Sequence, residues 1–87
     1  MAYLLQFTDK AKDDIAAHKK AGNKPVLNKL LKLLEELTEH PFTGTGKPEP
    51  LKYELTRCWS RRINKEHRLV YEVSDNEVFI LSAKGHY

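Results

Sequence analysis

The sequence contains a single cysteine, Cys58, in 87 residues. One cysteine cannot close a disulfide within the chain, which excludes the disulfide-rich scaffolds of small secreted proteins and fits a reducing cytoplasm. No apolar run approaches the roughly 20 residues that cross a bilayer, and the segment Met1–Phe7 lacks the basic start and long apolar stretch of a signal peptide. With hydrophobic residues at 40%, we expect a cytoplasmic protein without membrane contact and a single domain over residues 1–87.

Several common catalytic sites are also missing. The four histidines lack the paired spacing of a zinc site, and no carboxylate cluster suggests a two-metal phosphoesterase. The segment Gly44–Lys47 does not lead from a strand into a helix, as a P-loop must, and the order of residues suggests no Ser–His–Asp triad. We therefore expect neither a metal nor an organic cofactor.

The net charge of +3 is unevenly distributed along the chain. The stretch Lys47–Arg68 holds seven basic and three acidic residues, a balance of +4. A local cationic region is the expected footprint of a protein that binds a polyanion such as nucleic acid. A solvated sheet face has the same composition, so charge alone leaves both interpretations open.

The first half of the chain predicts a strand and two helices. Residues 3–7 alternate as a strand, Thr8 is placed to cap a helix that Gly22 ends, and Asn23 is placed to cap a second helix that Pro41 ends. The second helix has a leucine stripe at helical spacing, which predicts a buried face. Its members are Leu27, Leu30, Leu31, Leu34 and Leu37, widened by Val26 and Leu33.

The second half changes to the period of two that is typical of strands. A loop over residues 40–50 precedes alternating runs at 51–55, 59–63 and 68–73, and a more apolar run at 77–83 follows. The short connections favour antiparallel neighbours and hence a four-stranded meander. The predicted class is a two-layer α+β fold, in which the N-terminal strand and two helices pack on one face of a mainly antiparallel sheet.

Such a meander brings polar residues from four strands to one end of the sheet. They are Glu49, Lys52, Arg62, Lys65, Arg68, Lys84, His86 and Tyr87. This set suits transfer at an RNA phosphate, because RNA supplies its own nucleophile, the 2′-OH. The protein then needs a base, an acid and cations that stabilise the charge on phosphorus, and a carboxylate, a histidine and arginines fit these tasks.

Other residues have a structural interpretation. We expect exposed positions for Arg61 and His18, a turn without chemistry for Cys58, and a packing role for Trp59. Glu49 alone would be an ordinary loop residue, but Pro48 and Pro50 restrict the backbone on both sides of it and so pre-organise its carboxylate.

Four ordered blocks resemble a known family. The run Pro41–Lys52 (PFTGTGKPEPLK), the run Trp59–Ile63 (WSRRI), the run Glu66–Tyr71 (EHRLVY) and the closing His86-Tyr87 are similar to the YoeB/Txe toxins of the RelE-like toxin superfamily. The resemblance implies a RelE-like fold and the toxin of a type II toxin–antitoxin system. Such a toxin is a metal-independent endoribonuclease that cleaves mRNA in the ribosomal A site and so inhibits translation.

The resemblance also implies roles for individual residues. Glu49 matches the acid–base carboxylate, Arg68 the phosphate-stabilising arginine, His86 the histidine and Tyr87 the terminal tyrosine of the family. We assign Glu49 as base and His86 as acid, with the reverse also open. The residues that we assign to RNA binding are Lys47, Lys52, Arg62, Lys65 and Lys84.

The implied partners are a YefM/Axe-like antitoxin, the 70S ribosome with mRNA, and operator DNA only through the antitoxin; a homodimer is compatible with the family. Two other functions stay open, a ParE-like toxin that inhibits DNA gyrase and a non-catalytic RNA-binding module. In a meander, Glu49 and His86 are three strand spacings apart, about 14 Å. They would therefore flank a bound nucleotide rather than touch each other.

Overall fold

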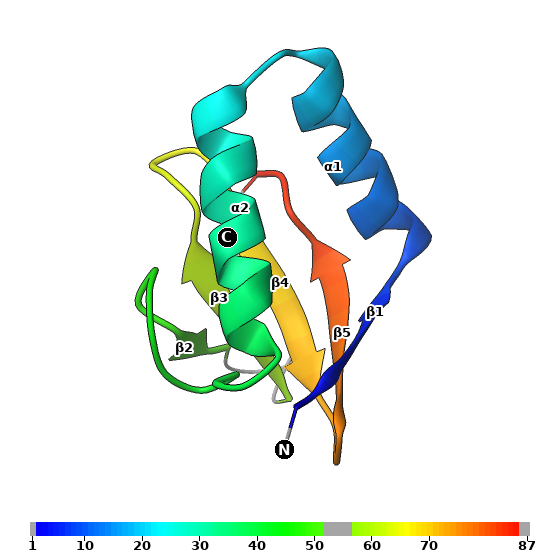
Figure 1. The fold of residues 1–87 in the computed structure, drawn as a ribbon, viewed down its shortest axis with the longest axis vertical. Helices are drawn as coiled ribbons and strands as arrows, with labels where there is room; N and C mark the ends of the chain where they lie inside the picture. Colours follow the sequence, from blue (N-terminus) through cyan, green and yellow to red (C-terminus); the bar gives the residue numbers. More distant parts are fainter. Residues whose placement is uncertain (1, 52–56, 86–87) are drawn as a thin grey trace.

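The computed structural model describes residues 2–51 and 57–85. These form β1 (Leu4–Phe7), α1 (Asp9–Lys20), α2 (Lys24–Leu37), β2 (Glu49–Pro50), β3 (Cys58–Arg62), β4 (Arg68–Val73) and β5 (Glu77–Ser82). Both helices lie over one face of the sheet (Figure 1), so the predicted α+β class is confirmed. Residues 52–55 of the predicted strand and the predicted site residues Lys52, His86 and Tyr87 lie outside the described residues.

The helices begin where the sequence predicts. The hydroxyl of Thr8 accepts a hydrogen bond from the Ala11 amide at 3.1 Å, and the side chain of Asn23 accepts one from the Val26 amide at 3.4 Å. These caps satisfy amides that have no partner inside the helix. Gly22 follows the first helix with a φ of 67°, a conformation that favours glycine, and so turns the chain into the second helix.

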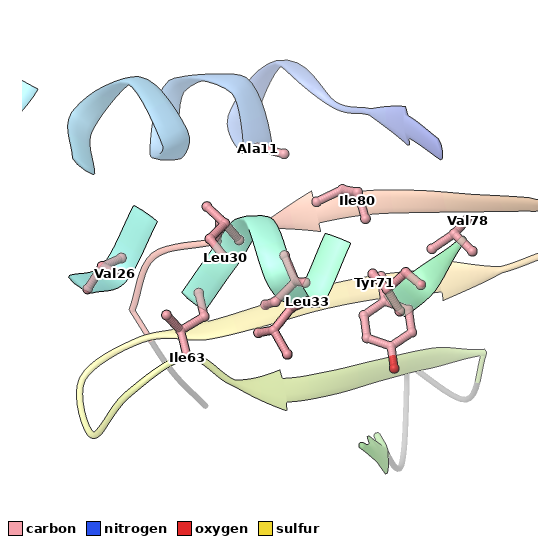
Figure 2. Close-up of a cluster of buried hydrophobic side chains, with 11 residues drawn as sticks. Ala11, Val26, Leu30, Leu33, Ile63, Tyr71, Val78 and Ile80 are labelled. Atoms are coloured by element: carbon pink, nitrogen blue, oxygen red, sulfur yellow. The ribbon is translucent and has the colours of Figure 1, made fainter. Parts of the chain in front are cut away.

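One face of α2 supplies much of the core. Its buried side chains are Val26, Leu30, Leu33 and Leu37. They pack with side chains of β4 and β5, among them Tyr71, Val78 and Ile80 (Figure 2). The predicted stripe was wrong for Leu31, which is 60% exposed. Helical spacing can be drawn through either set of leucines, and packing against the sheet selects the set that is centred on Leu33.

The sheet has five strands in the order β1-β5-β4-β3-β2. Strands β2 to β5 form the predicted antiparallel meander, and β1 joins it as an edge strand parallel to β5. The predicted loop over residues 40–50 was wrong at its end, because Glu49 and Pro50 form β2. Pro50 has no amide hydrogen to donate, which is tolerated because β2 is an edge strand. Cys58 is the first residue of β3, so its predicted position in a turn was wrong.

Two polar residues of α1 attach this helix to the chain beyond β5. The Asp14 carboxylate accepts a hydrogen bond from the Ala83 amide at 2.9 Å, and Nε2 of His18 lies 2.8 Å from the Ala83 carbonyl oxygen. His18 is therefore buried, and its predicted surface position was wrong. Its imidazole satisfies a carbonyl where β5 has ended and no neighbouring strand can do so.

Candidate active site

The alternation of side chains along β3 separates the core from the opposite face of the sheet. Trp59 and Ile63 pack on the core and Arg61 is fully buried, so Ser60 and Arg62 project to the other side. Residues directly opposite each other on antiparallel strands share a face. The outer face, as we call it, thus carries one row of Glu49, Ser60 and Val70 and a second row of Arg62 and Arg68.

The two arginines of the outer face are direct neighbours. Arg62 lies opposite Arg68 across β3 and β4. The Arg62 amide donates to the Gly46 carbonyl at 2.7 Å and the Arg68 amide to the Gly85 carbonyl at 2.8 Å, so neither amide bonds the facing strand. Such non-hydrogen-bonded pairs bring side chains closest together, with Cα atoms about 4.5 Å apart. Facing like charges are unfavourable, and an anion bound between them would remove the repulsion.

No described carboxylate neutralises this pair. The ion pairs within 4.0 Å in residues 2–51 and 57–85 involve neither Arg62 nor Arg68. Glu49, opposite Ser60, is diagonal to Arg62, and diagonal neighbours lie about 7–8 Å apart, within reach of long side chains. An exposed carboxylate thus stands beside two guanidinium groups without joining them in an ion pair, an arrangement that can hold a phosphate and exchange a proton near it.

A buried arginine fixes the loop that leads to Glu49. The Arg61 guanidinium donates to Glu36 Oε1 at 3.0 Å, to the Tyr71 hydroxyl at 3.1 Å and to the Thr43 carbonyl at 2.8 Å, and also to the His40 carbonyl. It is fully buried, so its predicted exposure was wrong. Arg61 therefore connects the end of α2, the loop over residues 40–47 and β4.

Electrostatics stabilise this connection. Burial alone would raise the pKa of Glu36, but the hydrogen bonds from Thr45 and the charge of Arg61 outweigh it and lower the pKa below its ordinary value of 4.5. Burial raises the pKa of Tyr71 despite the opposing charge of Arg61, so the hydroxyl stays protonated and donates to the Pro41 carbonyl at 2.7 Å. The loop is held by charged and neutral hydrogen bonds together.

The sequence matches, over residues 7–87, the family described as YoeB-like toxins of bacterial type II toxin–antitoxin systems. The chain belongs to the YoeB family. Toxin RelK of Mycobacterium tuberculosis is 48% identical over 67 residues, which cover 77% of this chain and 79% of that protein. The resemblance to YoeB toxins that the four sequence blocks suggest is thus confirmed.

Solved structures agree with this assignment. The YoeB dimer from Staphylococcus aureus is 40% identical, covers 100% of both chains and superposes with a TM-score of 0.88. The toxin in a heterotetrameric YoeB–YefM toxin–antitoxin complex from the same species is also 40% identical and covers 100% of both chains, with a TM-score of 0.85. The fold of the described residues is therefore that of known YoeB toxins.

The base of the outer face is uncharged and buried. Ser60 is 1% exposed and Val70 2%. Cys58 is also buried, and both its burial and the negative charge of Glu72 raise the pKa of its thiol. A thiol in this state is a poor nucleophile. We therefore assign Cys58 no catalytic role.

The predicted RNA-binding residues lie at the same end of the sheet as far as the structure describes them. Lys47 and Lys65 share a cavity with Arg62, and Lys84 is exposed just beyond β5. Gly85 is held against the start of β4, because its amide donates to Nδ1 of His67 at 3.0 Å and its carbonyl accepts from Arg68. The last described residue of the chain therefore contacts the backbone of a predicted catalytic residue.

Sequence reasoning missed the positions of two basic residues in this YoeB-family chain. Arg61 alternates with Trp59 and Ile63, and this register could have indicated that it faces the core. Lys29 of α2 lines the cavity with Lys47, and no sequence signal relates the two. Within residues 2–51 and 57–85, no three potential ligands among His, Cys, Asp and Glu gather as a metal site would require. No helix in the same ranges is long and apolar enough to span a bilayer.

Proposed function

We propose that this YoeB-family toxin is an endoribonuclease that cleaves mRNA on the ribosome without a metal ion and thereby inhibits translation. The observation that carries the proposal is the facing pair of Arg62 and Arg68 on the outer face, with Glu49 diagonal to Arg62. Two guanidinium groups at this spacing suit the oxygens of a phosphodiester, and the carboxylate stands where it can act on a neighbouring hydroxyl.

In the proposed reaction the 2′-oxygen of one nucleotide attacks the adjacent phosphorus. The bond from the 2′-oxygen to phosphorus forms while the bond from phosphorus to the 5′-oxygen breaks, leaving a 2′,3′-cyclic phosphate and a free 5′-hydroxyl. Glu49 takes the 2′-proton and His86 protonates the departing 5′-oxygen, or the two exchange roles. Arg68 and Arg62 stabilise the extra negative charge on the phosphorane, and Tyr87 completes the site.

The strand order supports separate positions for base and acid. β2 and β5 are three strand spacings apart, about 14 Å. His86 directly follows Gly85, whose carbonyl accepts a hydrogen bond from the Arg68 amide. A nucleotide lying across the outer face would thus have the Glu49 carboxylate on the side of β2, and we propose that His86, which follows Gly85 in the sequence, supplies the acid for an in-line displacement.

The proposed partners follow from the charge and from the relatives. The basic side chains Lys47, Lys52, Arg62, Lys65 and Lys84 would bind RNA phosphates, with the 70S ribosome presenting mRNA in its A site. A YefM/Axe-like antitoxin would neutralise the toxin by covering the outer face, since a related toxin from Staphylococcus aureus is found with YefM. A homodimer is proposed from the dimeric relative. Operator DNA would be bound only through the antitoxin, and the cytoplasm is the proposed location.

The test is cleavage of a defined mRNA on purified 70S ribosomes, with the cut positions mapped by primer extension. We expect cuts within the codon in the A site and a 2′,3′-cyclic phosphate on the upstream fragment. An mRNA with a single 2′-deoxynucleotide before the cut should resist cleavage at that position alone. If free RNA is also cut at high toxin concentration, that cleavage should persist in EDTA. Intact mRNA together with inhibition of DNA gyrase would contradict the proposal and favour a ParE-like activity.

A further inference from the structure

Four basic residues line one cavity at the edge of the sheet. The cavity has a volume of about 370 Å³ and is lined by Lys29, Gly46, Lys47, Arg62, Ile63, Asn64 and Lys65. Lys29 comes from α2, whereas the other basic residues come from the loop before β2, from β3 and from the turn that follows it. None of the described residues that line this cavity carries a carboxylate. Three separate segments of the chain therefore contribute positive charge to the same space.

The backbone around the cavity is held in place. Gly46 has a φ of 83°, and a Cβ atom at this position would lie 2.8 Å from the Arg62 carbonyl oxygen. The Arg62 amide in turn donates to the Gly46 carbonyl at 2.7 Å. Lys47, with a φ of 51°, is the one residue other than glycine with a positive φ among residues 2–51 and 57–85. This conformation is uncommon for a side chain such as lysine and fixes the position at which Lys47 enters the cavity.

The concentration of positive charge has no internal compensation. Among the described residues, Lys29, Lys47 and Lys65 make no ion pair within 4.0 Å. Cations gathered in a concave site create a positive potential that attracts anions. Lys29 is also half-buried, so its side chain moves less freely than that of a fully exposed lysine.

We propose that this cavity binds a backbone phosphate of the RNA at a nucleotide beside the one that is cleaved, and that Lys29 is part of this second phosphate site. The proposal rests on the proposed function. Arg62 connects the two places, because it faces Arg68 on the outer face and also lines the cavity. A polyanion that lies across the outer face can therefore continue into the cavity and stay in contact with basic residues along the way.

The lining favours a phosphate over a base or an acidic peptide. Among the described residues that line it, none is an aromatic residue on which a base could stack. Its one large apolar side chain, Ile63, is only 4% exposed, so a peptide would find no apolar anchor. Lysines bind phosphate as point charges without reading the base. The site should therefore contribute to affinity and leave sequence preference unchanged.

The test compares Lys29→Ala with Lys32→Ala, an exposed lysine on the same helix that does not line the cavity. Binding is measured to 70S ribosomes that carry an mRNA with 2′-deoxynucleotides at the cut, over a range of KCl concentrations. Loss of one phosphate contact should weaken binding roughly 5- to 10-fold at 0.1 M salt and reduce the slope of log K against log[salt] by about one. Lys32→Ala should change neither quantity.

Further arms separate the sources of the phosphate and the alternatives. A loss only with ribosomes that carry mRNA would support a phosphate of the message beside the cut. Equal losses with ribosomes that lack mRNA would identify an rRNA phosphate and overturn the inference. If Lys29→Ala and Lys32→Ala bind ribosomes with the same affinity and the same salt dependence, the inference is overturned. Cleavage by the wild-type protein would still support the proposed function in that case. A defect of Lys29→Ala in binding the antitoxin but not ribosomes would also overturn it. Absence of cleavage by the wild type would instead count against the proposed function itself.

Discussion

Arg61 and Glu36 form an ion pair of 3.0 Å in which the guanidinium is fully buried. Glu36 lies near the end of α2 and Arg61 near the end of β3, so the pair connects the two layers of the fold. The loop over residues 40–47 is attached to the same guanidinium through three of its carbonyls, those of His40, Thr43 and Thr45. Because this loop leads directly to Glu49, the pair positions one side of the proposed active site.

Removing this arginine should destabilise the fold strongly. Arg61→Ala leaves Glu36 without its partner and several partly buried carbonyls without donors. Breaking a buried ion pair typically costs about 3–5 kcal/mol. Unfolding in urea, followed by circular dichroism, measures the free energy of unfolding. Arg57→Ala, at an exposed position, is the matched control and should stay within about 0.5 kcal/mol of the wild type. A similar small change for Arg61→Ala would show that the network does not hold the fold together.

The same ion pair predicts how stability depends on pH. The pKa of Glu36 is lower in the folded chain than its ordinary value of 4.5. Its charge therefore stabilises the fold above about pH 4.5, and this contribution is lost as the pH falls through the lower, folded-state pKa. The difference in unfolding free energy between wild type and Glu36→Gln should be largest at neutral pH and shrink as the pH falls below the ordinary value of 4.5. A difference that stays constant over this range would argue against the assigned shift.

Gly46 should resist substitution more than Gly22 does. Both have a positive φ, but a Cβ atom on Gly46 would lie 2.8 Å from the Arg62 carbonyl, whereas one on Gly22 would meet nothing within 4 Å. Gly22→Ala should cost about 1 kcal/mol from the backbone alone, and Gly46→Ala about 2 kcal/mol or more. Thermal unfolding of both variants provides the comparison. Equal losses would mean that the loop can move away from β3.

The thiol of Cys58 should be almost unreactive in the folded chain. Burial and the charge of Glu72 raise its pKa, so little thiolate exists at neutral pH. We expect its reaction with Ellman's reagent at pH 7.5 to be roughly 100-fold slower than in the guanidinium-unfolded chain. A fast reaction in the folded chain would show that Cys58 is accessible and would reopen the question of its chemistry.

The sequence predicts the local elements well because their signals are local. The caps at Thr8 and Asn23 and the alternation through β4 each depend on neighbours a few residues away. The pairing of β1 with β5 is not predicted by a local signal, because parallel strands are not joined by a short turn that can be recognised in the sequence. The strand at Glu49–Pro50 was missed for a related reason, since proline signals a loop unless its strand is known to lie at an edge.

For the site, the sequence brings Glu49, Arg62 and Arg68 together through strand direction alone, and their register in the described sheet agrees. Arg61 was misassigned because a charged residue is exposed by default. Its burial becomes favourable only when the ends of α2, the loop and β4 supply enough acceptors, and these lie 10 to 25 residues away in sequence. The packing of α2 places Lys29 at the cavity, and no sequence motif predicts this position.

The proposed reaction is tested most directly by single-turnover cleavage of mRNA on 70S ribosomes with the variants Glu49→Gln and Arg68→Ala. Each should cleave at least ~100-fold more slowly than the wild type, with Arg68→Ala the slower, because one lacks the proton acceptor and the other a cation at the phosphorane. The controls Glu35→Gln and Arg57→Ala, both at exposed positions away from the outer face, should cleave at the wild-type rate. If folded Glu49→Gln and Arg68→Ala cleave as fast as these controls, the outer face is not the active site.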